Sequence, residues 1–140
     1  MATNFHKLTV KQVIRETPEC VSVVFDVPTE LQNEFKFKQG QYLTFKDIKD
    51  NEEIRRSYSI CSCPTEGELK VAVKKITNGI FSTYVNDILK AGDVLDVMTP
   101  QGNFYTEVEK SNEKVYVGIV AGSGITPVMS IMKTVLAIEP

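Results

Sequence analysis

The sequence predicts a mainly β protein: a six-stranded antiparallel Greek-key barrel with one inserted helix, followed by the first strand and helix of an incomplete α/β domain. The first supporting observation is that residues 7–99 contain six short apolar or alternating runs separated by turn residues. The second is that residues 115–121 are almost wholly apolar and lead through a glycine-rich loop into a helical pattern. We therefore expect a barrel over residues 1–110 and the start of a second domain over residues 113–140.

Each predicted strand of the barrel ends at residues that break a strand. The six runs cover residues 7–14, 21–27, 42–45, 54–61, 69–74 and 94–98. The polar, charged residues 46–53 are predicted to form a loop. A helix is predicted before the last strand, because apolar residues recur there at helical spacing. These residues are Phe81, Tyr84, Val85, Ile88 and Leu89.

The incomplete second domain is expected to begin with a strand buried on both faces, Val115 to Ala121, and to continue with a helix around Val128 to Leu136. One strand cannot build a parallel sheet, so we expect the chain to be a fragment of a longer enzyme. The unpaired strand should then pack back on the barrel or pair with a second copy, which would give a homodimer.

The charge balance argues against a nucleic-acid partner. The net charge of the 140 residues is -2, with no block of five or more like charges, whereas nucleic-acid-binding surfaces are usually strongly basic. No apolar run is as long as a membrane span, and the polar start lacks the features of a signal peptide. We therefore expect a cytoplasmic protein without a membrane partner.

Neither the cysteines nor the single histidine predict a metal site. Cys20, Cys61 and Cys63 are odd in number, and no second pair of ligands follows at the spacing of a zinc or iron–sulfur site. His6 has no acidic or thiol partner nearby in the sequence. We expect reduced thiols and no bound metal.

The first candidate site lies in the predicted strand that contains Arg56, Tyr58 and Ser59. Alternation along a strand places Arg56 and Tyr58 on one face, where a planar guanidinium can bind phosphate and a ring can support a planar heterocycle. Ser59 would lie on the other face or at the strand edge. A flavin nucleotide fits this pattern. A solvated charge, a half-buried ring and an edge hydroxyl fit it as well.

Two further segments carry backbone groups suited to phosphate. Asn78 and Gly79 form a turn that feeds a helix, where free N–H groups and the Ser82 hydroxyl could bind an anion, although an ordinary turn with Ser82 near the cap is an alternative. Residues 122–127, Gly-Ser-Gly-Ile-Thr-Pro, follow an apolar strand and precede a helix. That order predicts a nucleotide site.

In order and spacing, these segments resemble the ferredoxin–NADP reductase superfamily over nearly the whole chain. The markers are Arg56-Ser57-Tyr58-Ser59, the Gly79-x-x-Ser82 turn, Pro100-Gln101-Gly102-Asn103-Phe104 and Gly122-Ser123-Gly124-Ile125-Thr126-Pro127. Within the superfamily, residues 5–10, 53–61 and 97–102 are most similar to the family of reductase subunits that serve phenylacetyl-CoA epoxidases.

The resemblance implies a role for each site residue. Arg56 would hold the flavin phosphate, Tyr58 would lie against the isoalloxazine ring, and Ser59 would hydrogen-bond near its N5 atom. Residues 73–76 would offer backbone contacts, and residues 79–82 would bind the diphosphate. The implied catalytic residues are Ser59, Tyr58 and Thr126. The implied cofactor-binding residues are Arg56, Ser57, Tyr58, Ser59, Val73, Lys74, Ile76, Gly79, Phe81, Ser82, Gly124 and Thr126.

The resemblance also implies FAD as the cofactor and an NAD(P)H-dependent electron-transfer reductase as the complete enzyme. Hydride would pass from NAD(P)H to the flavin, and single electrons would then pass to an iron–sulfur domain or an oxygenase component. The enzyme would serve a phenylacetyl-CoA oxygenase or epoxidase in phenylacetate degradation. This chain alone would be inactive, because most of the nicotinamide domain is missing. The alternative is a flavin-free barrel that acts as a binding or regulatory module.

Overall fold

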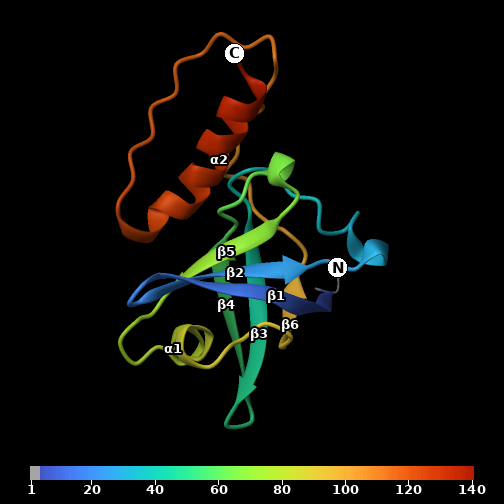
Figure 1. Ribbon diagram of the computed structural model, residues 1–140, viewed down its shortest axis with the longest axis vertical. Coiled ribbons are helices and arrows are strands. Elements are labelled where there is room, and N and C mark those ends of the chain that lie inside the picture. The colour runs from blue at the N-terminus through green and yellow to red at the C-terminus, as the bar shows by residue number, and fades with distance from the viewer. Residues whose placement is uncertain (1–3) are drawn as a thin grey trace.

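Six antiparallel strands form the centre of the computed structural model, which describes residues 4–140 (Figure 1). The strands are β1 (Phe5–Thr17), β2 (Cys20–Asp26), β3 (Tyr42–Lys49), β4 (Glu52–Ser59), β5 (Leu69–Lys74) and β6 (Val94–Met98). They lie in the order β4-β3-β6-β1-β2-β5. A bridge between Ile60 and Val71 joins the end of β4 to β5, so the two edges of the sheet meet. The predicted six-stranded antiparallel barrel is confirmed.

The predicted loop over residues 46–53 is wrong, because β3 and β4 continue through it as a tight hairpin. Asp50 and Asn51 form its tip with φ values of 52° and 64°, as a two-residue hairpin turn requires. The charged side chains remain in the strands because Lys46 and Arg55 both lie over the ring of Phe5, at 4.7 and 5.1 Å. That stabilising contact comes from β1 and is not visible in the local sequence.

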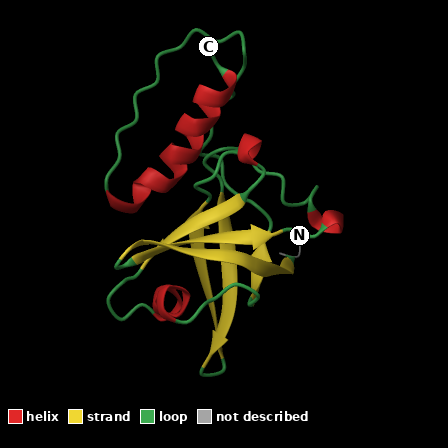
Figure 2. Cartoon of the chain, in the orientation of Figure 1, coloured by secondary structure: helices red, strands yellow, loops and turns green. Residues whose placement is uncertain are grey.

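The core of the barrel is a stack of aromatic rings surrounded by β-branched residues. Phe45 packs between Phe25 and Phe81, with ring centroids 5.6 and 5.7 Å away. Phe81 comes from α1 (Ile80–Asp87), which lies against one end of the barrel (Figure 2). The predicted helix is confirmed, and its buried face closes this end of the core.

The C-terminal region has a different character. It consists of an extended segment, the short 3₁₀ helix η3 (Gly122–Gly124) and α2 (Ile125–Ile138). Residues 113–121 run beside α2 without a strand partner among residues 4–140, and the side chains of Val115 and Ile119 are 93% and 94% exposed. The segment does not pack back on the barrel, which was one of the two predicted outcomes, and pairing with a second copy stays a prediction. Its apolar residues suit a strand with neighbours on both sides, and the described residues supply none.

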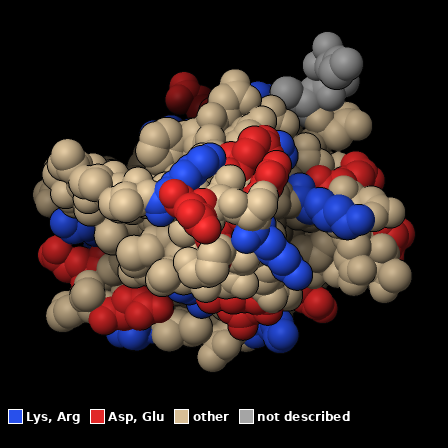
Figure 3. Space-filling model, turned by 90° about the horizontal axis from the view of Figure 1, so that it is seen from above, with Lys and Arg blue, Asp and Glu red and all other residues tan. Residues whose placement is uncertain are grey.

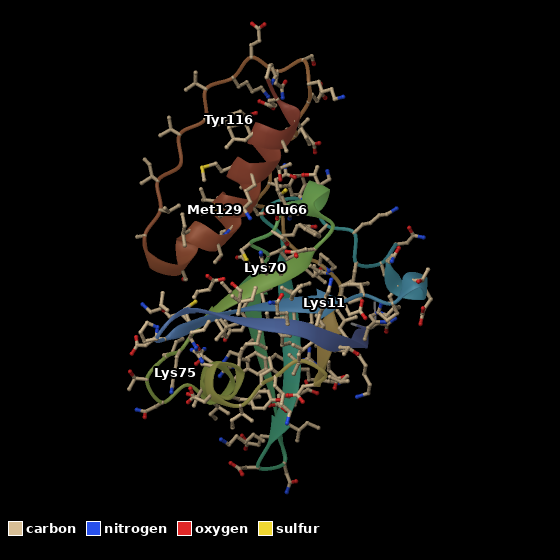
Figure 4. The ribbon with its side chains drawn as sticks, in the orientation of Figure 1. Lys11, Glu66, Lys70, Lys75, Tyr116 and Met129 are labelled. Atoms are coloured by element: carbon tan, nitrogen blue, oxygen red, sulfur yellow. The ribbon has the colours of Figure 1, made fainter. Side chains whose placement is uncertain are left out.

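Helix α2 contacts the barrel through the 3₁₀ turn η2 (Pro64–Glu66). The Ser130 hydroxyl donates to the Ser62 carbonyl at 2.6 Å, and both residues are fully buried. Lys133 Nζ lies 2.9 Å from Glu66 Oε1. At the other end of α2, the Tyr116 hydroxyl donates to Glu139 (Figure 4).

One further 3₁₀ turn, η1 (Thr29–Leu31), connects β2 to β3. None of the described helices combines the length and the apolar character needed to span a membrane. Acidic and basic side chains are interspersed over the face shown in Figure 3, in keeping with the net charge of -2.

Candidate functional site

Arg56 and Tyr58 leave β4 on the same face. The strand register places Phe45 opposite Arg56 and Leu43 opposite Tyr58, and partners in an antiparallel pair share a face. Arg56 is exposed and Tyr58 is half-buried, so the guanidinium extends to solvent while the ring rests on the core. The Arg56 guanidinium donates one hydrogen bond to the Arg55 carbonyl at 2.7 Å, and most of its donors are left for a ligand.

The environment of Tyr58 keeps its phenol neutral. Burial raises the pKa of Tyr58, and the positive charge of Arg56 acts in the opposite direction without cancelling the effect. A neutral phenol keeps an O–H donor and a ring that can pack against a second ring.

The ring of Tyr58 contacts Phe81, which belongs to the Gly79–Ser82 turn. The two ring centroids lie 6.0 Å apart with an interplanar angle of 29°. Two segments separated by more than twenty residues, the strand motif and the turn motif, are therefore brought together. This contact turns two separate sequence motifs into one site.

The turn itself presents unpaired donors. Gly79 is the N-cap of α1, and no side chain among residues 4–140 caps that end. The N–H groups of Ile80, Phe81 and Ser82 lie in the first turn, where a helix offers them no acceptor. The Ser82 hydroxyl oxygen accepts the Ile76 N–H at 3.1 Å, which leaves its own proton available for donation. A phosphate group, which accepts several hydrogen bonds and carries negative charge, suits these donors.

Glycine is required at position 79 by its close surroundings. A Cβ atom there would lie 2.4 Å from Ser82 Oγ and 3.0 Å from the Ile76 carbonyl oxygen. Asn78, just before it, adopts a positive φ of 61° that tightens the turn. Ser82 is the third residue of the helix and so lies near the cap, which fits an ordinary turn as well as an anion site.

A shallow hollow of about 390 Å³ lies between this turn and the tip of the β3–β4 hairpin. It is lined by Lys49, Asn78, Gly79, Ile80, Thr83, Tyr84 and Ile88. Lys49, Thr83 and Tyr84 were not among the site residues predicted from the sequence. A usable signal was present for the helix, because Ile80, Tyr84 and Ile88 are spaced by four and share the face that begins at Gly79. Lys49 carried no such signal, because it reaches the hollow only through the hairpin.

The remaining predicted residues of the barrel lie on the other face of β4, near the end of β5 and in the core. Ser57 and Ser59 leave the other face of β4, where the Ser57 hydroxyl lies 2.8 Å from Thr44 Oγ1 and Ser59 is half-buried opposite Tyr42. Three further predicted residues lie at or just after the end of β5. Of these, Val73 is buried, and Lys74 and Ile76 are exposed. Phe81 is only 2% exposed, so its side chain supports Tyr58 from within the core.

Gly124 and Thr126 lie elsewhere. Both are at the start of α2, which Figure 1 draws above β5, whereas α1 is drawn below β1. The Thr126 hydroxyl donates to the Ser123 carbonyl at 2.9 Å. Among residues 4–140, no hydrogen bond or ring contact joins these two residues to Tyr58, Ser59 or the Gly79 turn. Their predicted role at a nicotinamide site therefore stays a prediction.

Comparisons with known proteins agree with the geometry. The family model described as the oxidoreductase FAD-binding domain matches residues 7–105. A component of the 1,2-phenylacetyl-CoA epoxidase of Escherichia coli K12 is 46% identical over 138 residues, which are 99% of this chain and 39% of that protein. The ferredoxin reductase component of 3-ketosteroid-9-alpha-monooxygenase from Rhodococcus rhodochrous is 40% identical over 92% of this chain and 36% of its own length. The chain thus spans well under half the length of these relatives.

Solved structures share the fold. The FAD/NAD-binding domain of a nitric oxide dioxygenase from Vibrio cholerae superposes with a TM-score of 0.75 at 26% identity, covering 92% of this chain and 56% of that one. An Amycolatopsis cytochrome P450 reductase superposes with a TM-score of 0.76 at 25% identity, covering 95% and 40%. The family match, the barrel and the assembled Arg56, Tyr58 and Gly79 site lead to one conclusion: the chain belongs to the oxidoreductase FAD-binding domain family.

Proposed function

We propose that the chain binds FAD across β4 and the start of α1, as the flavin domain of an NAD(P)H-dependent electron-transfer reductase. The observation that carries this proposal is the 6.0 Å contact between the rings of Tyr58 and Phe81. It joins an exposed guanidinium and a neutral phenol to a turn of free N–H groups. FAD has the matching order of chemistry, a flat ring system followed by a diphosphate.

The residues fit the cofactor, and each has a distinct task. The fork of Arg56 would bind the diphosphate, together with the first-turn N–H groups of α1 and the Ser82 hydroxyl. The ring of Tyr58, supported from behind by Phe81, would hold the isoalloxazine ring. Ser59 would donate or accept a hydrogen bond near N5. Residues 73–76 would supply backbone groups. Ser57 would steady the motif through its contact with Thr44.

When bound, FAD would supply the redox chemistry, accepting a hydride from a reduced nicotinamide and releasing electrons one at a time. The protein would orient the ring and shield it from water. Gly124 and Thr126 would border the nicotinamide once the rest of that domain is present. For this reason we propose that the chain alone does not turn over NAD(P)H, although it binds FAD.

The electron acceptor we propose is an iron–sulfur domain or an oxygenase component. The support is the likeness to the phenylacetyl-CoA epoxidase component and to the reductase component of 3-ketosteroid-9-alpha-monooxygenase. A role in phenylacetate degradation follows from the higher identity of the first of these two. A cytoplasmic location stays a prediction, supported by three free thiols, which suit a reducing compartment.

The test of FAD binding uses a pair of neighbouring arginines. Titrating FAD with the purified chain should quench flavin fluorescence, and Arg56→Gln should raise the Kd about 10- to 100-fold, because it removes charge-assisted hydrogen bonds to phosphate. Arg55→Gln is the matched control. Arg55 lies on the other face of β4 and pairs with Glu53 at 2.6 Å, so its loss should change the Kd less than about twofold.

Two results would overturn the proposal. A colourless preparation that leaves FAD fluorescence unchanged would favour the flavin-free barrel. Equal effects of Arg55→Gln and Arg56→Gln would show that β4 attracts FAD only by general charge. Mixing the FAD-loaded chain with NADPH or NADH should leave the flavin absorbance unbleached, whereas rapid bleaching would contradict the proposed need for the rest of the nicotinamide domain.

A further inference from the structure

Asn86 is a buried polar residue in α1. Both the nitrogen and the oxygen of its side-chain amide are hydrogen-bonded. The residue is 4% exposed. Its Nδ2 group donates to the Ser82 carbonyl at 2.9 Å and to the Val73 carbonyl at 3.0 Å. Its Oδ1 atom accepts a hydrogen bond from Arg15 Nη1 at 3.1 Å. Such a fully satisfied amide in a protein interior holds its neighbours in one arrangement.

The three partners of Asn86 come from three different elements. Ser82 belongs to the phosphate turn, Val73 lies near the end of β5, and Arg15 lies in β1. The amide therefore ties the first turn of α1 to the strand that leads into Ile76. Since the Ile76 N–H donates to Ser82 Oγ, Ser82 is held through its hydroxyl by Ile76 and through its backbone carbonyl by Asn86.

Arg15 determines which way the amide faces. A guanidinium has only donors, so it must meet the Oδ1 atom and not the NH₂ group. Arg15 Nη2 also donates to the backbone carbonyl of Asn86, which makes the contact two-pronged. With Oδ1 occupied by Arg15, both N–H bonds of Nδ2 point to the carbonyls of Val73 and Ser82. The reverse orientation would place an oxygen against two carbonyl oxygens.

We propose that Asn86, oriented by Arg15, is a positioning residue for the diphosphate of FAD. It holds Ser82 and the first-turn N–H groups of α1 in the arrangement that receives the phosphates, without touching the cofactor. This inference rests on the proposed FAD site. It adds two residues, on the far side of the turn from the ligand, that set the shape of the site.

The test separates positioning from simple stability by comparing two neighbouring residues. Asn86→Asp keeps the shape and the acceptor for Arg15 but removes both N–H donors. Val85→Ala, at a residue 1% exposed in the same helix, lowers stability by removing buried apolar atoms and leaves the hydrogen bonds of Asn86 to Ser82 and Val73 in place. Urea unfolding of each variant gives the conditions in which both are fully folded. FAD affinity is then measured by fluorescence quenching under those conditions.

We expect the Kd for FAD to rise about tenfold in Asn86→Asp and to change less than about twofold in Val85→Ala. Asn33→Asp, at an exposed position outside the site, controls for the added negative charge. Arg15→Gln is the second variant in case Asn86→Asp does not fold. Arg15 is exposed, so the fold should tolerate the change, and the Kd should rise about threefold.

The outcomes distinguish this inference from the proposed function. If the unaltered chain does not bind FAD, the proposed function fails and this inference fails with it. If the unaltered chain binds FAD and the folded Asn86→Asp variant binds it equally well, only the positioning role is overturned. Equal losses of affinity in Asn86→Asp and Val85→Ala would also overturn it, because a general loosening of α1 would then explain both. If Asn86→Asp does not fold, the test rests on Arg15→Gln. An unchanged Kd for FAD in that variant overturns the proposal that Arg15 orients Asn86 to position the diphosphate.

Discussion

Valine residues in two regions of the chain have the same chemistry and opposite surroundings. Val97 lies in β6 between β1 and β3 and is fully buried, whereas Val117 lies in the extended segment beside α2 and is 82% exposed. Both stretches are rich in β-branched residues, which favour an extended backbone. Of the two stretches only β6 becomes a strand, because within residues 4–140 only β6 has neighbours to complete its hydrogen bonds. The β-propensity of the residues makes both segments extended, but a segment joins a sheet only when a neighbouring strand pairs with it.

The same contrast separates the two helices. Helix α1 buries Phe81 and Val85 in the core and is tied to β5 and β1 through Asn86. Helix α2 buries only Ser130 and Thr134, and its polar contacts with the barrel are at Ser62 and Glu66. The flavin side of the molecule is therefore built by the barrel itself. The C-terminal region, which we propose as the start of a nicotinamide domain, is held by a small number of polar contacts.

The largest expected effect compares the two valines directly. Val97→Ala should lower the free energy of unfolding by about 2–3 kcal/mol, from lost burial and the cavity left behind. Val117→Ala should change it by less than about 0.5 kcal/mol, because its side chain has little burial to lose. Urea denaturation followed by circular dichroism measures both. Comparable losses would mean that residues 113–121 are covered in solution, as by a second copy of the chain.

A second, smaller effect concerns the contact of α2 with the barrel. Ser130→Ala removes the buried hydrogen bond to the Ser62 carbonyl and leaves that oxygen without its donor, which should cost about 1–3 kcal/mol of docking free energy. Hydrogen exchange of the α2 amides should quicken while exchange in β6 stays unchanged. Ser123→Ala, at an exposed serine, is the control. Unchanged exchange in α2 would show that Ser130 does not hold the helix.

The smallest effect is the pH dependence of the same contact. Burial alone would raise the pKa of Glu66, but hydrogen bonds from Lys133 and from the Cys63 N–H outweigh it and lower that pKa below its ordinary value of 4.5. Because the pKa of Glu66 is lowered, the Glu66–Lys133 pair contributes fully to the docking of α2 above about pH 4.5. This contribution is lost as the pH falls through the pKa of Glu66 in the folded protein. The hydrogen bond with Glu66, against an opposing effect of burial, raises the pKa of Lys133 above 10.5, so its contribution persists in mildly alkaline solution.

For this half-exposed pair we expect about 0.2–1 kcal/mol. Amide chemical shifts of residues 130–134, followed from pH 7 to pH 3, should report the loss. Glu66→Gln should remove this dependence and leave the shifts near their acid values at every pH. A profile that is the same with and without Glu66 would assign the transition to another carboxyl group.

Much of the fold follows from local pattern. The apolar runs located all six strands within a few residues, because alternation and turn residues act over short distances. The hairpin at residues 46–53 was missed for the opposite reason. Its charged residues stay in strands through Lys46 and Arg55 packing on Phe5, and that ring lies about forty residues earlier in the chain.

The site divides in the same way. Arg56, Tyr58, Gly79 and Ser82 were identifiable because each has a chemistry that its local backbone explains. Asn86 and Lys49 were not, since an asparagine in a helix and a lysine in a polar stretch have no distinctive local pattern. The role proposed for Asn86 and the place of Lys49 beside the hollow come from partners that only the folded chain supplies.

By itself, the sequence determined the strands, the helix after the Gly79 turn and the donor groups suited to a flavin nucleotide, since periodicity, turn chemistry and backbone N–H groups are local properties. Only the tertiary structure decided that Tyr58 would meet Phe81, that Asn86 would face Ser82 and that residues 113–121 would stay unpaired. Ring packing, buried hydrogen bonds and sheet pairing each need two distant segments to meet, and that meeting is settled by the fold of the whole chain.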